Sequence, residues 1–209
     1  MDGLLIDSEV VVREGVVRAA AALGHAFPPQ LFMDSIGRSE ADYLRILIDN
    51  FGPDFPLEEF RARERLEIKR LFEGGVQLKT GVVELIDALD RRGLPLAVAT
   101  SSGRESARTH LGAHGLYERF QTVVAREDTP RHKPNPDPFL EAARRLKVDP
   151  QDCLALEDSH NGVRAAHAAG MMTVMVPDLL DPTEEMRGLC IHIADSLHRV
   201  RDLVLGMDA

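Results

Sequence analysis

The sequence has little of several features that would place it in a specialised class of protein. Only two of its 209 residues are cysteine, Cys153 and Cys190, and they form no CxxC pair. This excludes a disulfide framework and fits a reducing compartment. No apolar run approaches the ~18 residues that a membrane span needs, and the start has acidic residues at positions 2, 7 and 9 in place of a basic signal segment. We therefore expect a cytoplasmic protein without a membrane partner.

Basic charge is also scarce, because 25 Lys and Arg residues stand against 34 Asp and Glu residues, for a formal net charge of −9. Nucleic-acid binders usually carry a basic stripe, so no nucleic-acid partner is expected. The hydrophobic content of 44% and charged content of 28% are those of an ordinary globular protein. The length allows one large domain or two unequal domains.

Two patterns of hydrophobicity divide the chain. From about residue 10 to 75 the pattern is helical, and three helices are expected in VVREGVVRAAAALG, SEADYLRILIDNFG and PLEEFRARERLEIKRLF. From about residue 80, amphipathic helices alternate with short apolar runs that predict strands: LPLAVAT, FQTVVA, CLALED and MTVMVPD. Such alternation is typical of a parallel sheet covered on both faces. The sequence thus predicts an α/β fold whose Rossmann-like core spans 1–9 and 78–209, with an inserted helical domain at 10–77.

Polar residues follow the predicted strands at their carboxyl ends, where open α/β sheets bind ligands. Thr100 and Ser101 follow LAVA, Glu157 and Asp158 follow LAL, and Lys133 stands in HKPNP after FQTVVA. Taken singly, these residues could be helix caps, first-turn acids and a surface lysine. As a set, carboxylates, hydroxyls and one cation suit a hard metal ion beside an anion such as phosphate.

Four stretches resemble the motifs of the haloacid dehalogenase superfamily, and the resemblance is to its β-phosphoglucomutase-like phosphatase branch. MDGLLIDSE resembles the first motif without its opening residue, AVATSS the second, HKPNPDPF the third and LALEDSHNGVRAAHAAGM the fourth. Their order and spacing agree with the family over essentially the whole chain. The resemblance implies the family's parallel-sheet core with an α-helical cap domain at residues 10–77.

The resemblance also implies roles for individual residues. Asp2 would be the general acid/base that protonates the leaving group and activates water, and its backbone carbonyl would bind Mg²⁺. Thr100 and Lys133 would be the other catalytic residues, both binding the phosphoryl group. Glu157 and Asp158 would complete the Mg²⁺ site with Asp2. The remaining phosphate- and substrate-binding candidates are Gly3, Ser101, Arg38, Ser39 and Glu40. For Arg38, Ser39 and Glu40, the alternative interpretation is a helix N-cap preceded by a solvated arginine.

The implied reaction is hydrolysis of a phosphate ester through an aspartyl-phosphate intermediate. The family motif is Asp-x-Asp-Gly, in which the first Asp is the nucleophile, and Met1 stands at the x position. We therefore expect the nucleophile, and the strand that carries it, just upstream of Met1. A non-catalytic phosphometabolite-binding protein is the alternative if the natural chain starts at Met1.

A phosphomutase is the alternative enzyme. Mutases of this branch carry a histidine in the first cap helix, and the matching position is Val12, which favours a phosphatase. The expected substrate is a small phosphorylated metabolite, such as a sugar phosphate, and the expected cofactor is Mg²⁺. The expected assembly is a monomer or a weak homo-oligomer.

Overall fold

The computed structural model describes residues 1–36 and 38–206, which belong to two compact units. Met1–Ile6 and the chain from Leu78 onward form one unit, called the core unit below, and Asp7–Gln77 form the helical unit. The core unit contains parallel strands between helices, whereas the described residues of the helical unit contain helices and loops. The prediction of an α/β fold with a parallel-sheet core and a helical insertion is confirmed.

Parallel strands pair in two separate sheets within the described core unit. One sheet joins β1 and β2, and the other has the order β3-β4-β5. The strands are β1 (Ala97–Ala99), β2 (Thr122–Val124), β3 (Leu154–Glu157), β4 (Met172–Met175) and β5 (His192–Ile193). The four apolar runs therefore form the first four strands. The sequence does not predict β5, because two paired residues are too few to produce a recognisable alternation.

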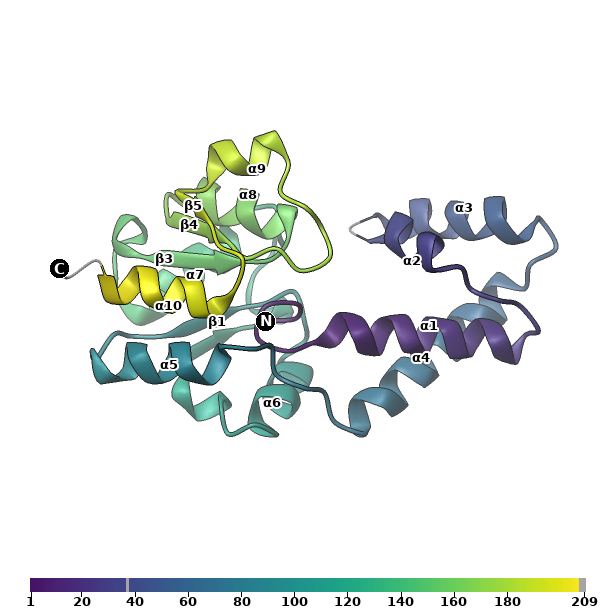
Figure 1. The fold of residues 1–209 in the computed structure, drawn as a ribbon, viewed down its shortest axis with the longest axis horizontal. Coiled ribbons are helices and arrows are strands. Elements are labelled where there is room, and N and C mark those ends of the chain that lie inside the picture. The colour runs from purple at the N-terminus through teal and green to yellow at the C-terminus, as the bar shows by residue number, and fades with distance from the viewer. Residues whose placement is uncertain (37, 207–209) are drawn as a thin grey trace. The chain divides into compact units, whose positions relative to one another are not determined.

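Helices accompany the strands of both sheets (Figure 1). The helices of the described core unit are α5 (Val82–Arg91), α6 (Arg104–Gly112), α7 (Asp137–Leu146), α8 (His160–Ala168), α9 (Glu184–Leu189) and α10 (Leu197–Gly206). Three short 3₁₀ helices are η1 (Tyr117–Arg119), η2 (Arg126–Asp128) and η3 (Pro150–Asp152). Helix α7 contacts β1 and β2, α8 contacts β3 and β4, and α5 contacts α10. The sequence does not predict α9, which spans six residues.

Small side chains let α8 pack closely on its sheet. Ala165 and Ala166 are fully buried, and they join Ala155 of β3 and Phe139 of α7 in one apolar cluster. Val163, also in α8, packs with residues of β4 and α9 in a second apolar cluster. Because alanine side chains are short, the start of α8 is held near the carboxyl end of β3, where the predicted acidic pair stands.

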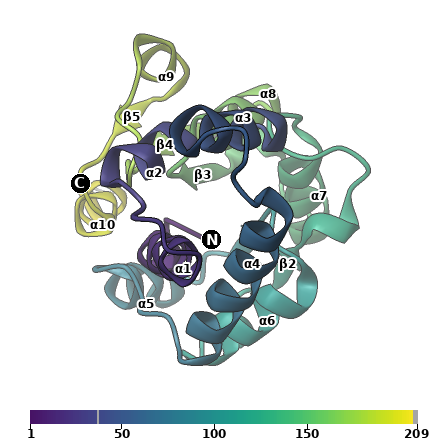
Figure 2. The ribbon, with the colours of Figure 1, turned by 90° about the vertical axis from the view of Figure 1, so that its right-hand side faces the viewer.

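Four helices make up the described helical unit: α1 (Ser8–Ala22), α2 (Pro29–Ser35), α3 (Glu40–Phe51) and α4 (Leu57–Glu73). Helices α1 and α4 lie side by side (Figures 1 and 2). Gly15 of α1 makes this possible, since a β-carbon there would stand 2.5 Å from a side-chain carbon of Ile68 in α4. The sequence predicts α1, α3 and α4 but not α2, a seven-residue helix that begins at a proline.

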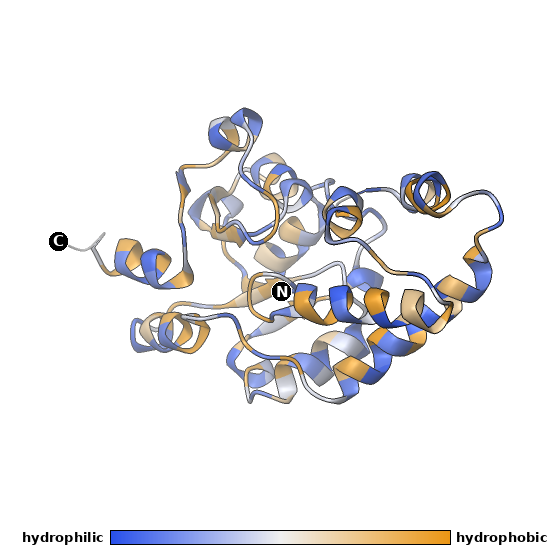
Figure 3. Ribbon diagram, turned by 45° about the vertical axis from the view of Figure 1, so that its right-hand side comes forward, coloured by the Kyte–Doolittle hydropathy of each residue, from blue (hydrophilic) through white to orange (hydrophobic). Residues whose placement is uncertain are grey.

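An aromatic cluster lies inside the helical unit. The rings of Phe51 and Phe55 stack at a centroid distance of 4.5 Å, and His25 meets both rings edge-on. Phe27 and Phe60 extend the stack. Figure 3 shows hydrophilic and hydrophobic residues alternating along the helices, as expected of surface helices with one buried face. No helix in residues 1–36 and 38–206 combines the length and apolar character needed to cross a membrane.

Candidate active site

A tight turn at the start of the core unit presents Asp2. The carbonyl oxygen of Met1 accepts hydrogen bonds from the N–H groups of Leu5 and Ile6, at 2.8 and 3.2 Å. The N–H of Gly3 donates to the carbonyl of Ile6, and Gly3 adopts a φ of +71°, a conformation that glycine tolerates and other residues rarely adopt. Backbone hydrogen bonds therefore fix the residues on both sides of Asp2.

Two hydroxyl groups from the loop after β1 reach the Asp2 carboxylate. The Ser102 hydroxyl donates to Asp2 Oδ2 at 2.7 Å, and the Thr100 hydroxyl donates to the same oxygen at 3.4 Å. The Ser102 N–H in turn donates to the Thr100 hydroxyl oxygen. The predicted residue Ser101 is exposed instead. Sequence reasoning missed Ser102, although it belongs to the same TSS stretch, because the pattern does not show which way each side chain of a loop turns.

Lys133 joins this loop to the acidic pair. Its ammonium group donates to the carbonyl oxygen of Ala99, next to Thr100, at 3.0 Å, and it forms a short ion pair with Glu157 Oε1. Burial is the largest influence on Glu157 and alone would raise its pKa. The positive charges of Lys133 and of the Met1 nitrogen, with hydrogen bonds from Lys133 and Ser159, together outweigh burial and lower the pKa. Glu157 is thus held as a carboxylate at a buried position.

The opposite oxygen of Glu157 is fixed by the start of α8. The Ser159 hydroxyl donates to Glu157 Oε2 at 3.2 Å and accepts the N–H of Gly162, which makes Ser159 the N-cap of α8. A β-carbon at position 162 would overlap the Glu157 carboxylate, so only glycine leaves room for it. Ser159 and Gly162 both stand in the fourth motif of the sequence.

Asp158 and Asp178 bring further negative charge against the Asp2 turn. A β-carbon on Gly3 would collide with Asp158 Oδ2 and would stand 3.3 Å from Asp178 Oδ2. Burial, with the neighbouring charge of Glu157, raises the pKa of Asp158 to about 7. Asp178 follows β4 and pairs with Lys79 through Oδ1 at 2.6 Å, while its buried Oδ2 has no hydrogen-bond partner within the described residues.

This surplus of buried negative charge fits a cation. A buried carboxylate with a raised pKa and an unpartnered carboxylate oxygen are both relieved by a nearby positive charge. In residues 1–36 and 38–206, no three His, Cys, Asp or Glu side chains are grouped so that they alone could hold a metal ion. Mg²⁺ does not need such a group, because it usually takes one or two carboxylates together with water and substrate oxygens.

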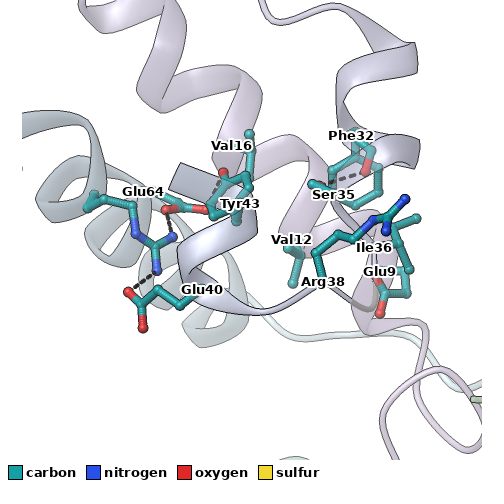
Figure 4. A pocket seen from close by; sticks show the side chains of 11 residues that line it. Glu9, Val12, Val16, Phe32, Ser35, Ile36, Arg38, Glu40, Tyr43 and Glu64 are labelled. Carbon is teal, nitrogen blue, oxygen red and sulfur yellow. Dashed lines mark hydrogen bonds and ion pairs between the residues drawn. The ribbon is translucent and has the colours of Figure 1, made fainter. Parts of the chain in front are cut away.

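Three of the predicted substrate-binding residues, Arg38, Ser39 and Glu40, lie in the helical unit. Arg38 and Glu40 line a cavity of about 330 Å³, whose apolar wall includes Val12 and Phe32 (Figure 4). In that view Arg38 lies beside Glu9, and Glu40 lies toward Glu64. Ser39 acts as the N-cap of α3, since its hydroxyl oxygen accepts the N–H of Asp42 at 3.1 Å.

A charged network that sequence reasoning missed closes one side of this cavity. The Tyr43 hydroxyl donates to Glu64 Oε1 at 3.0 Å, and Arg61 forms ion pairs with Glu64 and, at 3.1 Å, with Glu40. Burial, with the nearby charge of Glu64, raises the pKa of Tyr43, so its hydroxyl stays a donor. Glu64 is buried inside a charged helix, where its position in the pattern gives no sign that it faces inward.

Comparison with known proteins identifies the family of this chain. A family model described as haloacid dehalogenase-like hydrolase matches residues 1–170. The chain belongs to this family. The predicted resemblance is confirmed, and so is the prediction that the chain is an enzyme of a hydrolase family.

Individual relatives of this haloacid dehalogenase-like chain are named phosphatases. A bifunctional riboflavin kinase/FMN phosphatase of Arabidopsis thaliana is 32% identical over 183 residues, which are 86% of this chain and 47% of that protein. The chain therefore spans about half the length of that relative. A phosphorylated carbohydrates phosphatase of Thermotoga maritima is 32% identical over 171 residues, 82% of this chain and 79% of that protein.

A solved structure agrees over the whole chain. A Thermotoga maritima protein with the provisional name beta-phosphoglucomutase is 27% identical, with a TM-score of 0.84 over 99% of this chain and 96% of that chain. The shared fold thus includes both the core unit and the helical unit.

Proposed function

We propose that the chain is a Mg²⁺-dependent phosphatase of a small phosphorylated metabolite that works through an aspartyl-phosphate intermediate. The observation that carries the proposal is the contact between the hydroxyls of Ser102 and Thr100 and the carboxylate of Asp2, with Lys133 bonded to the next backbone carbonyl. These groups supply a proton carrier, hydrogen-bond donors for phosphate oxygens and one positive charge. The named phosphatases among the relatives support the same reaction class.

Each predicted site residue of the core unit has a proposed role. Asp2 donates a proton to the leaving oxygen as the bond from phosphorus to that oxygen breaks, and later takes a proton from the attacking water. Thr100 and Lys133 hold the phosphoryl oxygens, and Ser101 offers its backbone N–H to the same anion. Gly3, whose own N–H is bonded to the Ile6 carbonyl, contributes by leaving room for Asp158 and Asp178 beside the Asp2 turn. The backbone carbonyl of Asp2 and the carboxylates of Glu157 and Asp158 are proposed to hold Mg²⁺. When bound, this ion would neutralise charge on the phosphate.

The proposed nucleophile is an aspartate joined to the nitrogen of Met1. The Met1 nitrogen lies close enough to Glu157 and Asp158 for a charge on it to lower the pKa of both carboxyl groups. A residue bonded there would therefore stand beside the acidic pair. Its carboxylate oxygen would form the bond to phosphorus in the first step, and water would break that bond in the second step, releasing phosphate and regenerating the carboxylate.

The helical unit is proposed to read the leaving group. Arg38 and Glu40 offer a positive and a negative group at the cavity, and Ser39 holds the first turn of α3 that follows Arg38. Such a surface can bind hydroxyl and charged groups of a sugar phosphate or a similar metabolite. We also propose a cytoplasmic location and a monomer or weak homo-oligomer.

A phosphate-release assay on the native protein tests this proposal. A panel of sugar, polyol and nucleotide phosphate monoesters is assayed with Mg²⁺ and with a chelator, and borohydride reduction is used to trap an acyl phosphate. Phosphate release that needs Mg²⁺, with a trapped aspartate directly before Met1, is expected. Release without that adduct would overturn the mechanism, and no release from any ester would overturn the function.

The Mg²⁺ site is tested without turnover by thermal unfolding. Mg²⁺ that binds only the folded protein raises its melting temperature, and Asp158→Asn should abolish this rise. Asp152→Asn, which changes an exposed aspartate six residues before Asp158, serves as the matched control. An unchanged Mg²⁺ effect in Asp158→Asn would contradict the assignment.

A phosphomutase is the second candidate, because the similar Thermotoga maritima structure carries that name. Val12 weighs against it, since this residue lies in the cavity wall and cannot exchange a proton. The two are separated by incubating a hexose 1-phosphate with and without a bisphosphate activator. Isomerisation faster than phosphate release would favour the mutase.

A further inference from the structure

The loop that carries Thr100 and Ser102 is tied to the turn after β2. The Thr100 N–H donates to the Val124 carbonyl at 2.9 Å, and the Arg126 N–H donates to the Ser102 carbonyl at 3.0 Å. These two bonds extend the β1–β2 pairing past the ends of both strands. The turn formed by residues 125–128 is called the clamp turn below, and the loop that carries Thr100 and Ser102 is called the Ser102 loop. The clamp turn therefore supports the backbone of the Ser102 loop.

Two acidic side chains of the clamp turn bind the first residue of α6. Glu127 Oε2 accepts the backbone N–H of Arg104 at 3.1 Å, and Asp128 Oδ1 accepts the Arg104 guanidinium at 2.6 Å. Gly103 lies directly between Ser102 and this anchor, and a β-carbon on it would stand 3.0 Å from Glu127. The Ser102 loop is thus held at its backbone and at the start of its helix.

Asp128 is the centre of the clamp turn. Its Oδ2 accepts the N–H of Ala125 at 2.8 Å, which closes the turn, and its Oδ1 also accepts Arg145 of α7 at 2.9 Å. Arg145 in turn donates to the Val123 carbonyl of β2. The Asp128 side chain is only 8% exposed, whereas the Arg104 side chain is 56% exposed. A buried carboxylate with this many charged and backbone donors is a rigid anchor rather than a surface ion pair.

We propose that Asp128 is a positioning residue: through the clamp turn and Arg104 it fixes the loop that brings the Ser102 hydroxyl onto Asp2. This inference rests on the proposed function, in which Asp2 transfers the proton. A hydroxyl bonded to the Asp2 carboxylate restricts its rotation, and proton transfer to a leaving oxygen depends on that orientation. Removing the anchor should therefore slow the chemical step more than it weakens substrate binding.

A double-mutant cycle tests the route from Asp128 to Ser102. Asp128→Asn and Ser102→Ala are made singly and together in the full chain, and kcat and KM are measured. Each single variant should lower kcat on the order of 10-fold, with KM changed less than about 2-fold. The double variant should be no slower than Ser102→Ala, because both changes break one chain of contacts. Effects on kcat that multiply would overturn the proposal.

Hydrogen exchange supplies a readout that does not depend on activity. Amide exchange in peptides covering residues 100–106 should become at least several-fold faster in Asp128→Asn. The matched control is Asp87→Asn, which removes a carboxylate from an Asp–Arg pair on the surface of the same unit, Arg119 being its partner at 2.8 Å. Unchanged exchange at residues 100–106 would refute the anchor even if the native protein released no phosphate and the proposed function failed.

A milder variant keeps the test decisive if Asp128→Asn does not fold. Arg104→Gln removes the exposed guanidinium but leaves its backbone N–H bonded to Glu127. It should lower kcat by a smaller factor, about 2- to 5-fold, with faster exchange confined to the same peptides. A wild-type kcat together with wild-type exchange in this variant would count against the proposal.

Discussion

Lys133 and Glu157 form an ion pair in which the two side chains are only 10% and 6% exposed. Breaking a buried pair leaves an uncompensated charge, which typically costs about 3–5 kcal/mol. Lys133→Met should therefore lower the free energy of unfolding by about that amount, measured by urea denaturation. The double variant Lys133→Met/Glu157→Gln removes both charges and should be more stable than the single variant.

An exposed pair provides the comparison for this experiment. Lys69 and Glu73 are 3.9 Å apart, with side chains 74% and 64% exposed. Exposed pairs contribute about 0–1 kcal/mol, so Lys69→Met should change stability little. Similar losses in Lys69→Met and Lys133→Met would mean that the buried pair has no special weight.

Replacing glycine by alanine should have opposite effects on stability at positions 162 and 112. A β-carbon at Gly162 would overlap the Glu157 carboxylate, which Lys133 and Ser159 hold in place. Gly112 ends α6 and has open space around its α-carbon within the described structure. Gly162→Ala should therefore destabilise the protein, whereas Gly112→Ala should stabilise it by about 0.4–1 kcal/mol through the unfolded chain. Thermal unfolding of both variants checks the two signs.

The sequence predicts most of the core because its signals are local. The runs around β1 to β4 are apolar over several residues, and the polar residues that follow them fall at one edge of a parallel sheet by topology alone. This is why Lys133 and Glu157, 24 positions apart, could be placed in one site before the fold was known.

The parts that the sequence does not predict depend on distant contacts or on short elements. Strand β5 is paired over two residues, so its stability comes from β4 and not from its own pattern. The bond between Lys79 and Asp178 joins residues 99 positions apart, and neither residue type signals the other. Ser102 was missed for a different reason, since the direction of a loop side chain depends on backbone angles that the clamp turn sets.

Tyr43 provides a test inside the helical unit. Tyr43→Phe removes the hydroxyl that donates to Glu64 at 3.0 Å and leaves a buried carboxylate oxygen without that donor. The loss should be about 1–3 kcal/mol in the free energy of unfolding. Tyr117→Phe, a half-buried tyrosine in the core unit, is the matched control and should change stability by less. Equal losses in the two variants would contradict a specific role for the bond.

The carboxyl group of Asp128 predicts a pH dependence of stability with a defined sign. Burial would raise its pKa, but hydrogen bonds from Arg145, the Ala125 N–H and Arg104 outweigh burial and lower the pKa to about 2. An unfolded aspartate has a pKa of about 3.9. The stabilisation is therefore complete above the unfolded pKa and is lost as the pH falls toward 2. The difference in unfolding free energy between wild type and Asp128→Asn should be constant above about pH 5 and shrink below about pH 4. Because asparagine keeps the shape of the side chain, a difference that stayed constant from pH 6 to pH 3 would show that the charge of Asp128 is not what holds the clamp turn.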